Sequence, residues 1–128
     1  MNYAIIGFGE IGQTLAKAFA RKGIAVSVAT TRDPQSFASA ATAIGPGITP
    51  TTLAEAVKAD VIFLAVRFQS HPDVAKALPS WQGKIIVDVT NAYGVPDEKL
   101  GGQPAARVVA RAFTGAKVVK GFNHLVAA

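Results

Sequence analysis

Three glycines near the start of the chain have the spacing of a phosphate-binding turn. Gly7, Gly9 and Gly12 occur in the segment GFGEIG, directly after the apolar run Tyr3–Ile6. Apolar residues at helical spacing follow them up to Gly23. Dinucleotides bind at such a strand–turn–helix junction, because free N–H groups at the start of the helix face the pyrophosphate. The three glycines would permit the tight turn, the approach of the phosphates and the close packing of helix on strand, in that order.

The residues between these glycines belong to the predicted dinucleotide site. They are Phe8, Glu10 and Ile11. We expect Ile11 to contribute mainly to the core, whereas Phe8 suits either the cofactor cleft or the core. The alternative for the whole segment is a turn whose glycines serve only to pack a helix against a strand.

The segment VATTRDP, at the end of a second apolar run, bears on which dinucleotide binds. Many NAD-binding chains have an acidic residue here, whose carboxylate accepts a hydrogen bond from a ribose hydroxyl. This chain has Thr30, Thr31 and Arg32 instead, and their donors suit a 2′-phosphate. Asp33 would oppose a phosphate if it turned inward, but the following Pro34 favours a role as helix cap. The sequence predicts NADP(H), with a solvated loop cation as the alternative role of Arg32.

These candidate residues lie on alternating strand-like and helix-like segments. Nearly continuous apolar runs are typical of parallel strands that are covered on both faces. The predicted strands are Tyr3–Ile6, Ile24–Ala29, Val61–Val66, Ile85–Val89 and Lys117–Val119, with a short further strand near Gly47–Thr49. Strands joined by helices imply right-handed crossovers and an open parallel sheet. We therefore predict one α/β domain over residues 1–128, a Rossmann-type doubly wound parallel sheet in three α/β/α layers.

Helix starts are marked by residues that can cap free N–H groups. Asp33 and Pro34 suit the cap and the first position of one helix. Thr52–Glu55 and Ser70–Asp73 resemble capping boxes, and the second is the weaker because it ends in Asp. A last helix is predicted over Pro104–Phe113.

Composition excludes several classes of protein. The chain has 128 residues, 50% of them hydrophobic, no cysteine and a net charge of +5. Without cysteine it forms no disulfide and has no thiolate, and no apolar run is long enough to span a membrane. The basic residues are scattered rather than gathered in a stripe, so we expect no nucleic-acid partner. We expect a cytoplasmic protein that acts on a small molecule.

Five segments of the chain, in order, are YAIIGFGEIGQTLAKAFARKGI, VATTRDP, LAEAVKADVIFLAV, GKIIVDVTNAYG and AKVVKGFN. Together they resemble the NADP-dependent oxidoreductases of the coenzyme F420 type. The resemblance implies hydride exchange between NADP(H) and a second redox partner, a deazaflavin (F420) or a flavin such as FMN. It assigns NADP contacts to the three glycines of the turn, Thr31 and Arg32. It also assigns contacts near the nicotinamide to Ala65, Val66 and Asn91.

Two departures from this family concern the place where the second redox partner would stack. Arg67 and Ala92 both stand where the family commonly has proline, and Arg67 is counted among the predicted cofactor contacts. The chain also stops at NHLVAA, whereas such proteins usually continue with elements that close the pocket and form a dimer. We expect either a nucleotide-binding domain or a short relative that completes its pocket with a partner, with a homodimer left open.

The predicted chemistry requires no acid or base. Hydride transfer between two rings needs alignment and exclusion of water more than a proton donor. We therefore predict no catalytic side chain, and no metal site, because the two histidines are far apart and lack acidic partners. Asn123 and His124 follow the last predicted strand and are added to the cofactor-binding residues. Asp88 is expected to bind backbone donors, and His71 is expected at the surface.

Two other functions remain open. The chain would suit the N-terminal NADP-binding half of an imine or 2-hydroxy-acid reductase, whose substrate site lies on further helices. It would also suit a non-catalytic NADPH-binding regulatory module.

Overall fold

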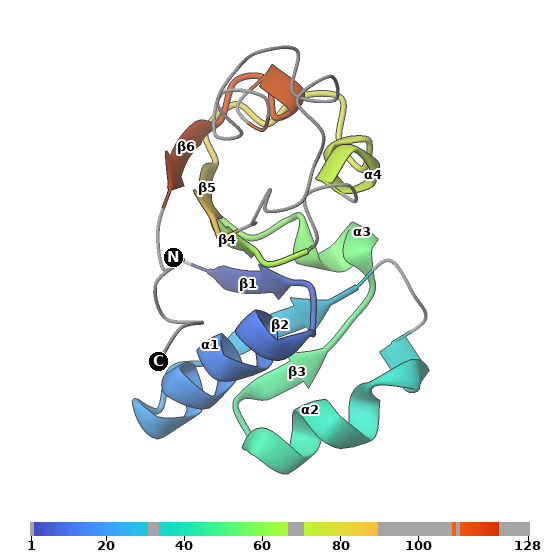
Figure 1. The fold of residues 1–128 in the computed structure, drawn as a ribbon, viewed down its shortest axis with the longest axis vertical. Helices are drawn as coiled ribbons and strands as arrows, with labels where there is room; N and C mark the ends of the chain where they lie inside the picture. Colours follow the sequence, from blue (N-terminus) through green and yellow to red (C-terminus); the bar gives the residue numbers. More distant parts are fainter. Residues whose placement is uncertain (1, 31–33, 67–70, 90–108, 110, 121–128) are drawn as a thin grey trace.

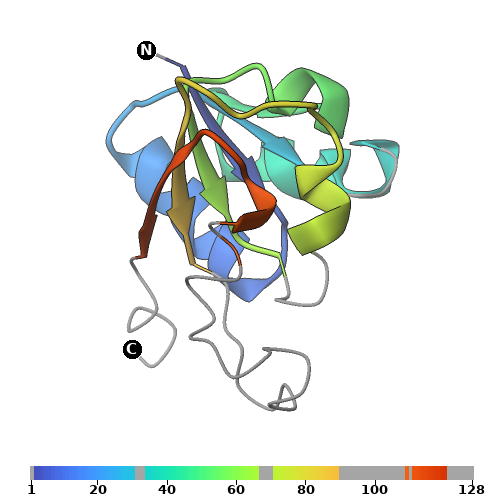
Figure 2. The same ribbon diagram turned by 90° about the horizontal axis from the view of Figure 1, so that it is seen from above.

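The structure, a computed structural model, describes residues 2–30, 34–66, 71–89, 109 and 111–120. Within them, six parallel strands form one sheet in the order β3-β2-β1-β4-β5-β6 (Figure 1). The strands are β1 (Tyr3–Ile6), β2 (Val26–Ala29), β3 (Ile48–Pro50), β4 (Val61–Leu64), β5 (Ile85–Asp88) and β6 (Lys117–Lys120). All of the arrows in Figure 2 point toward the same edge of the sheet. This order and direction confirm the predicted Rossmann-type doubly wound sheet.

The strand boundaries differ from the predicted ones at several ends. The N–H of Ile24 donates to the Phe19 carbonyl at 3.0 Å, which holds Ile24 in the turn after the first helix rather than in β2. The side chain of Ile24 is 38% exposed as a result. β4 ends at Leu64, two residues before the predicted end, where the backbone passes beside Gly7. The short further strand is confirmed as β3, one residue beyond the predicted position.

The helices of the described part are short apart from the first. They are α1 (Glu10–Arg21), the 3₁₀ helix η1 (Pro34–Ser36), α2 (Ala38–Ile44), α3 (Leu53–Ala56) and α4 (His71–Ala75). None of them is long and apolar enough to cross a membrane. Gly23 ends the segment after α1 with a φ of +70°, a conformation that glycine adopts readily. The last predicted helix lies mostly outside the described residues, which place only Val109, Arg111 and Ala112 in helix.

The predicted helix that starts at Pro34 is divided in the structure. Pro34 begins η1, and α2 begins separately at Ala38. Between them Phe37 has a φ of −132° and a ψ of 5°, which is not helical. The break brings the Phe37 ring into the core, 5.5 Å from the ring of Phe8. Burial of this aromatic side chain therefore outweighs continuation of the helix.

The strands supply two separate hydrophobic cores, one on each face of the sheet. Ile5, Val28 and Phe63 pack on the side of α1 and α2, whereas Ile6 and Ile62 pack on the side of α3 and α4. Alternate side chains of a strand point to opposite faces, so continuous apolar runs fill both layers. The three-layer arrangement follows from this alternation.

Trp81 anchors the core on the α3 and α4 side. Its side chain is 1% exposed, and its ring meets Phe113 edge-on with 4.8 Å between the ring centres. The indole N–H donates to the Ala75 carbonyl at 3.0 Å, so the polar end of this side chain is satisfied. Trp81 thus connects the end of α4 with the segment before β6.

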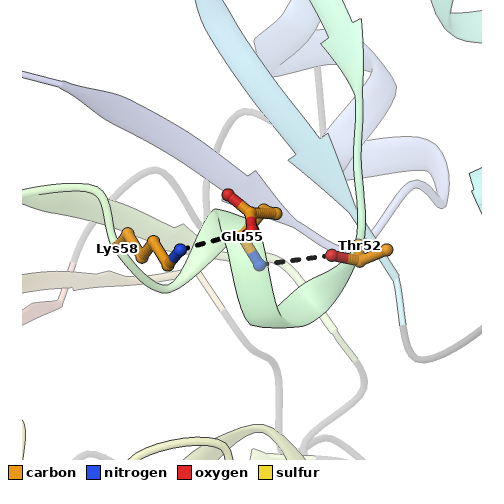
Figure 3. A network of polar contacts seen from close by, with 3 residues as sticks. All are labelled: Thr52, Glu55 and Lys58. Atoms are coloured by element: carbon orange, nitrogen blue, oxygen red, sulfur yellow. Dashed lines mark hydrogen bonds and ion pairs between the residues drawn. The ribbon is translucent and has the colours of Figure 1, made fainter.

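The start of α3 follows the predicted capping pattern. The Thr52 hydroxyl oxygen accepts a hydrogen bond from the Glu55 N–H at 3.2 Å, and the Glu55 carboxylate lies 3.3 Å from the Lys58 ammonium (Figure 3). The cap satisfies one of the N–H groups that have no partner within the helix. The cap predicted from the sequence is confirmed here.

The start of α4 corrects one prediction. Ser70 lies outside the described residues, and α4 begins at His71. His71 was expected at the surface, but it is 3% exposed. Val74, three residues later and on the same helix face, is also buried. The packing of α4 against the sheet therefore carries His71 inward.

Replacement of the α3 cap should reduce stability measurably. Thr52→Ala removes the acceptor of the Glu55 N–H, so we expect the free energy of unfolding to fall by about 1 kcal/mol. Urea unfolding monitored by Trp81 fluorescence measures the change. Thr42→Ala is the matched control, because Thr42 is an exposed helix residue whose hydroxyl donates to the Ala38 carbonyl and caps no N–H group. Equal losses in both variants would contradict the capping role.

Candidate functional site

The candidate site lies where the sheet reverses its strand order, between β1 and β4. At this point the chain leaves neighbouring strands in opposite directions, and doubly wound sheets bind ligands there at the carboxyl ends of the strands. The Gly7 N–H donates to the Ala29 carbonyl at 2.7 Å, and the Ala65 N–H donates to the Ile6 carbonyl at 2.8 Å. These bonds join the ends of β1, β2 and β4 around the glycine turn.

Gly7 and Gly12 are required by the packing of this turn. Gly7 has a φ of +111°, and a Cβ atom there would lie 2.5 Å from the Ala65 carbonyl oxygen. A Cβ atom on Gly12 would collide with the Gly7 carbonyl oxygen. Both glycines therefore have the structural roles predicted for them, a tight turn and close packing of α1 on β1.

Gly9 differs from these two glycines because no described residue crowds it. It is exposed, and a Cβ atom there would meet no atom within 4 Å in the part of the chain that the structure describes. Gly9 is the N-cap of α1, and it has φ −81° with no side-chain cap. Packing of the described residues thus gives no reason for glycine at this position. A ligand that approaches the backbone would give one.

The residues between the glycines divide between core and surface. Phe8 and Ile11 are half-buried and pack against the core on the α1 side, as predicted for Ile11. The ring contact between Phe8 and Phe37 favours the core role of Phe8. Glu10, the first residue of α1, is exposed. A carboxylate in the first turn interacts favourably with the helix dipole.

Gln13 is a residue of this turn that the sequence reasoning missed. Its backbone N–H donates to the Gly9 carbonyl at 2.9 Å. Its side-chain Nε2 donates to the Phe8 carbonyl at 3.0 Å. The only sequence signal was a side-chain amide directly after Gly12, a position to which the glycine spacing assigns no role.

The described part of the site also includes the ends of β2 and β4. Thr30 follows β2 and is buried. Ala65 and Val66 follow β4 and are half-buried, and the Ala65 carbonyl lies against Gly7. Asp88, the last residue of β5, is fully buried. The remaining predicted contacts lie outside the described residues, namely Thr31, Arg32, Arg67, Asn91, Asn123 and His124.

Two further features of the described residues lie apart from the glycine turn. Among these residues, no group of three or more His, Asp or Glu side chains could hold a metal ion. A hollow of about 430 Å³ lies on the side of the sheet where the strands begin, near Tyr3, Val26 and Lys58. It adjoins the amino ends of the strands, so it is separate from the turn.

Solved structures share this architecture. A hypothetical protein of Sinorhizobium meliloti is 37% identical with a TM-score of 0.89, and the match covers 100% of this chain and 66% of that one. A proposed F420-dependent NADP reductase of Arthrobacter sp. FB24 is 28% identical with a TM-score of 0.77, over 96% of this chain and 62% of that one. The chain thus spans less than two thirds of the length of either protein. No curated protein matches it.

A more distant likeness shows the fold alone. A reductive aminase of Aspergillus terreus, solved in complex with NADPH, is 22% identical with a TM-score of 0.70. The match covers 94% of this chain and 39% of that one. A fold like that of this chain therefore also occurs within a much longer protein.

The family comparison covers the part of the chain that contains the glycine turn and the ends of β2 and β4. Residues 2–92 match the family described as NADP oxidoreductase, coenzyme F420-dependent. This span is well over half of the 128 residues. With the glycine turn at the expected edge of a Rossmann-type sheet, the match shows that this chain belongs to the coenzyme F420-dependent NADP oxidoreductase family.

Proposed function

We propose that the protein binds NADPH at the glycine turn and exchanges a hydride between NADPH and a deazaflavin or flavin. The observation that carries the proposal is Gly9, a glycine at the start of α1 that no contact among the described residues requires. Membership of an NADP oxidoreductase family supports NADP(H) as the dinucleotide. Bound NADPH would supply the hydride itself, so the protein has to bind, orient and shield it.

The pyrophosphate would bind to backbone groups at the start of α1. No described side chain caps this end of the helix, and Gly9 leaves room for phosphate oxygens to approach. N–H groups of the first helical turn carry partial positive charge, which stabilises an anion there. The turn cannot relax away from the ligand easily, because Gly7 is held between Gly12 of α1 and Ala65 at the end of β4.

The 2′-phosphate would bind at the end of β2. Thr30 is placed there by β2, whose neighbour β1 ends in the glycine turn. Thr31 and Arg32 follow in the sequence. A guanidinium forms charge-assisted hydrogen bonds with phosphate, and threonine hydroxyls can add further donors. This part of the proposal depends on the residue types and on the family.

The nicotinamide would lie toward β4, where the second redox partner would stack on it. Ala65 and Val66 are the described residues at that end, and the Ala65 carbonyl is held against Gly7. Family membership supports a deazaflavin or a flavin as the partner. Arg67, Asn91, Asn123 and His124 are the further proposed contacts, on the basis of the sequence. Transfer between two aligned rings in a site without water would need no acid or base from this chain.

A hydride-transfer assay tests the proposed activity. NADPH is mixed with the protein and either oxidised F420 or FMN, and NADPH oxidation is followed by its absorbance. We expect turnover with at least one of the two acceptors. NADPH binding without turnover would contradict the proposed reaction and favour a regulatory module or a reductase half that needs further helices. Absence of NADPH binding would contradict the proposal as a whole.

Gly9→Ala should separate ligand binding from folding. The added methyl group meets no atom of the described residues but would occupy space needed by the pyrophosphate. Overpacking of a close contact costs about 1–3 kcal/mol, so the Kd for NADPH should rise about 5- to 150-fold. Titration of NADPH fluorescence measures the Kd, and thermal unfolding shows whether the fold is kept.

Two variants complete the Gly9 experiment. Gly47→Ala is the matched control, because its Cβ atom would make ordinary contacts, with Ala25 Cα at 3.5 Å, near the amino end of β3. It should bind NADPH as the wild type does. Gly12→Ala should instead lower the melting temperature, since its Cβ atom collides with the Gly7 carbonyl. NADPH binding by Gly9→Ala that equals wild-type binding would disprove the pyrophosphate site.

Arg32→Ala should change the preference between the two dinucleotides. A charge-assisted hydrogen bond contributes about 1.5–3 kcal/mol, so NADPH should bind about 12- to 150-fold more weakly. NADH has no 2′-phosphate, so its Kd should change little. Calorimetric titration with both cofactors measures the two constants. Equal losses for NADPH and NADH would show that Arg32 does not recognise the 2′-phosphate.

A further inference from the structure

Gln13 makes two hydrogen bonds to the carbonyl groups that lead into α1. The backbone N–H of Gln13 donates to the Gly9 carbonyl at 2.9 Å, as expected for the first hydrogen bond of the helix. Its side-chain Nε2 donates to the Phe8 carbonyl, one residue earlier, at 3.0 Å. Gln13 is half-buried, so its amide is partly withdrawn from water. One residue therefore holds two consecutive peptide groups of the turn.

Because of peptide geometry, the hydrogen bond from the Gln13 side chain to the Phe8 carbonyl also sets the direction of the Gly9 N–H. A peptide group is planar and trans, so its C=O and N–H point in opposite directions. Holding the Phe8 carbonyl toward Gln13 therefore directs the Gly9 N–H away from it. The opposite orientation would turn a carbonyl oxygen outward, and a carbonyl oxygen repels an anion.

The turn needs such a constraint because of its glycines. Gly7 and Gly9 flank Phe8, and glycine allows more backbone conformations than any other residue. Gly7 is held by its hydrogen bond to the Ala29 carbonyl and by the backbone of Ala65 close beside it. Gly9 is exposed and has no comparable neighbours among the described residues. The peptide between Phe8 and Gly9 thus lies on the less restrained side of the turn, where the Gln13 amide reaches it.

We propose that Gln13 is a positioning residue for the pyrophosphate of NADPH: its side-chain amide fixes the Phe8–Gly9 peptide so that the N–H points to the phosphates. The proposal rests on the proposed NADPH site. It adds that a side chain of α1, which itself needs no contact with the cofactor, holds the backbone of the glycine turn in the orientation that binds phosphate.

Gln13→Met tests the role, because methionine keeps the length of the side chain and its tendency to form helix but has no donor. Loss of one neutral hydrogen bond costs about 0.5–1.5 kcal/mol, which corresponds to a Kd for NADPH about 2- to 12-fold higher. Adenosine 2′-monophosphate is the second ligand, and its Kd is measured by displacement of NADPH. It has the 2′-phosphate but no pyrophosphate, so its Kd should stay within about twofold.

Thr14→Ala is the matched control for this experiment. Thr14 is the next residue of α1, and its hydroxyl donates at 2.9 Å to the Glu10 carbonyl, which lies beyond the Phe8–Gly9 peptide. It should bind both ligands as the wild type does. If Gln13→Met does not fold, Gln13→Leu provides the same test, since leucine favours helix, is uncharged and cannot donate to the Phe8 carbonyl.

The possible results separate this role from the function on which it rests. A selective loss of NADPH affinity supports the positioning role. Unchanged NADPH affinity in Gln13→Met or, if that variant does not fold, in Gln13→Leu overturns it, as does an equal loss for both ligands, which would show general damage to the region. A wild-type protein that binds no NADPH would overturn the proposed function together with this role.

Discussion

The close approach of backbone to backbone around Gly7 is the constraint on which the candidate site depends. The Gly7 carbonyl lies where a Cβ atom of Gly12 would be, and the Ala65 backbone lies where a Cβ atom of Gly7 would be. No side chain larger than that of glycine fits at position 7 or at position 12. The start of α1 is thereby pressed against the ends of β1 and β4. Because these elements are rigid, the exposed backbone of Gly9 is presented in one place at the edge of the sheet.

The proposed pyrophosphate site consists of backbone groups, and for this reason charge and composition say little about it. The N–H groups at the start of a helix attract phosphate whatever the side chains are. The chain has a net charge of +5, and its basic residues are spread along the sequence. Hydride transfer would likewise require placement of two rings rather than a reactive side chain. The side chains that matter here are those that control backbone position, and Gln13 is the described example.

Local features of the sequence predicted the fold well and the contacts between elements less well. The strand runs, the glycine turn and the Thr52 cap depend on neighbours within a few residues, and the structure has all of them. Two of the errors occurred where distant parts pack together. His71 is buried because α4 packs on the sheet, and the helix after Pro34 is interrupted because Phe37 enters the core. The partner of an aromatic ring or a helix face cannot be read from periodicity.

The sequence by itself determined the class of fold and the position of the turn, since apolar runs, glycine spacing and family segments are all local patterns. Only the tertiary structure decided which glycine serves packing and which is left open. Gly7, Gly9 and Gly12 look alike in the sequence, but two of them face the backbone and one faces open space. It also decided that the Gln13 amide reaches the Phe8 carbonyl. These distinctions arise from the packing of α1 against β1 and β4. This packing brings together backbone atoms far apart in the chain, such as those of Gly7 and Ala65, which are 58 residues apart.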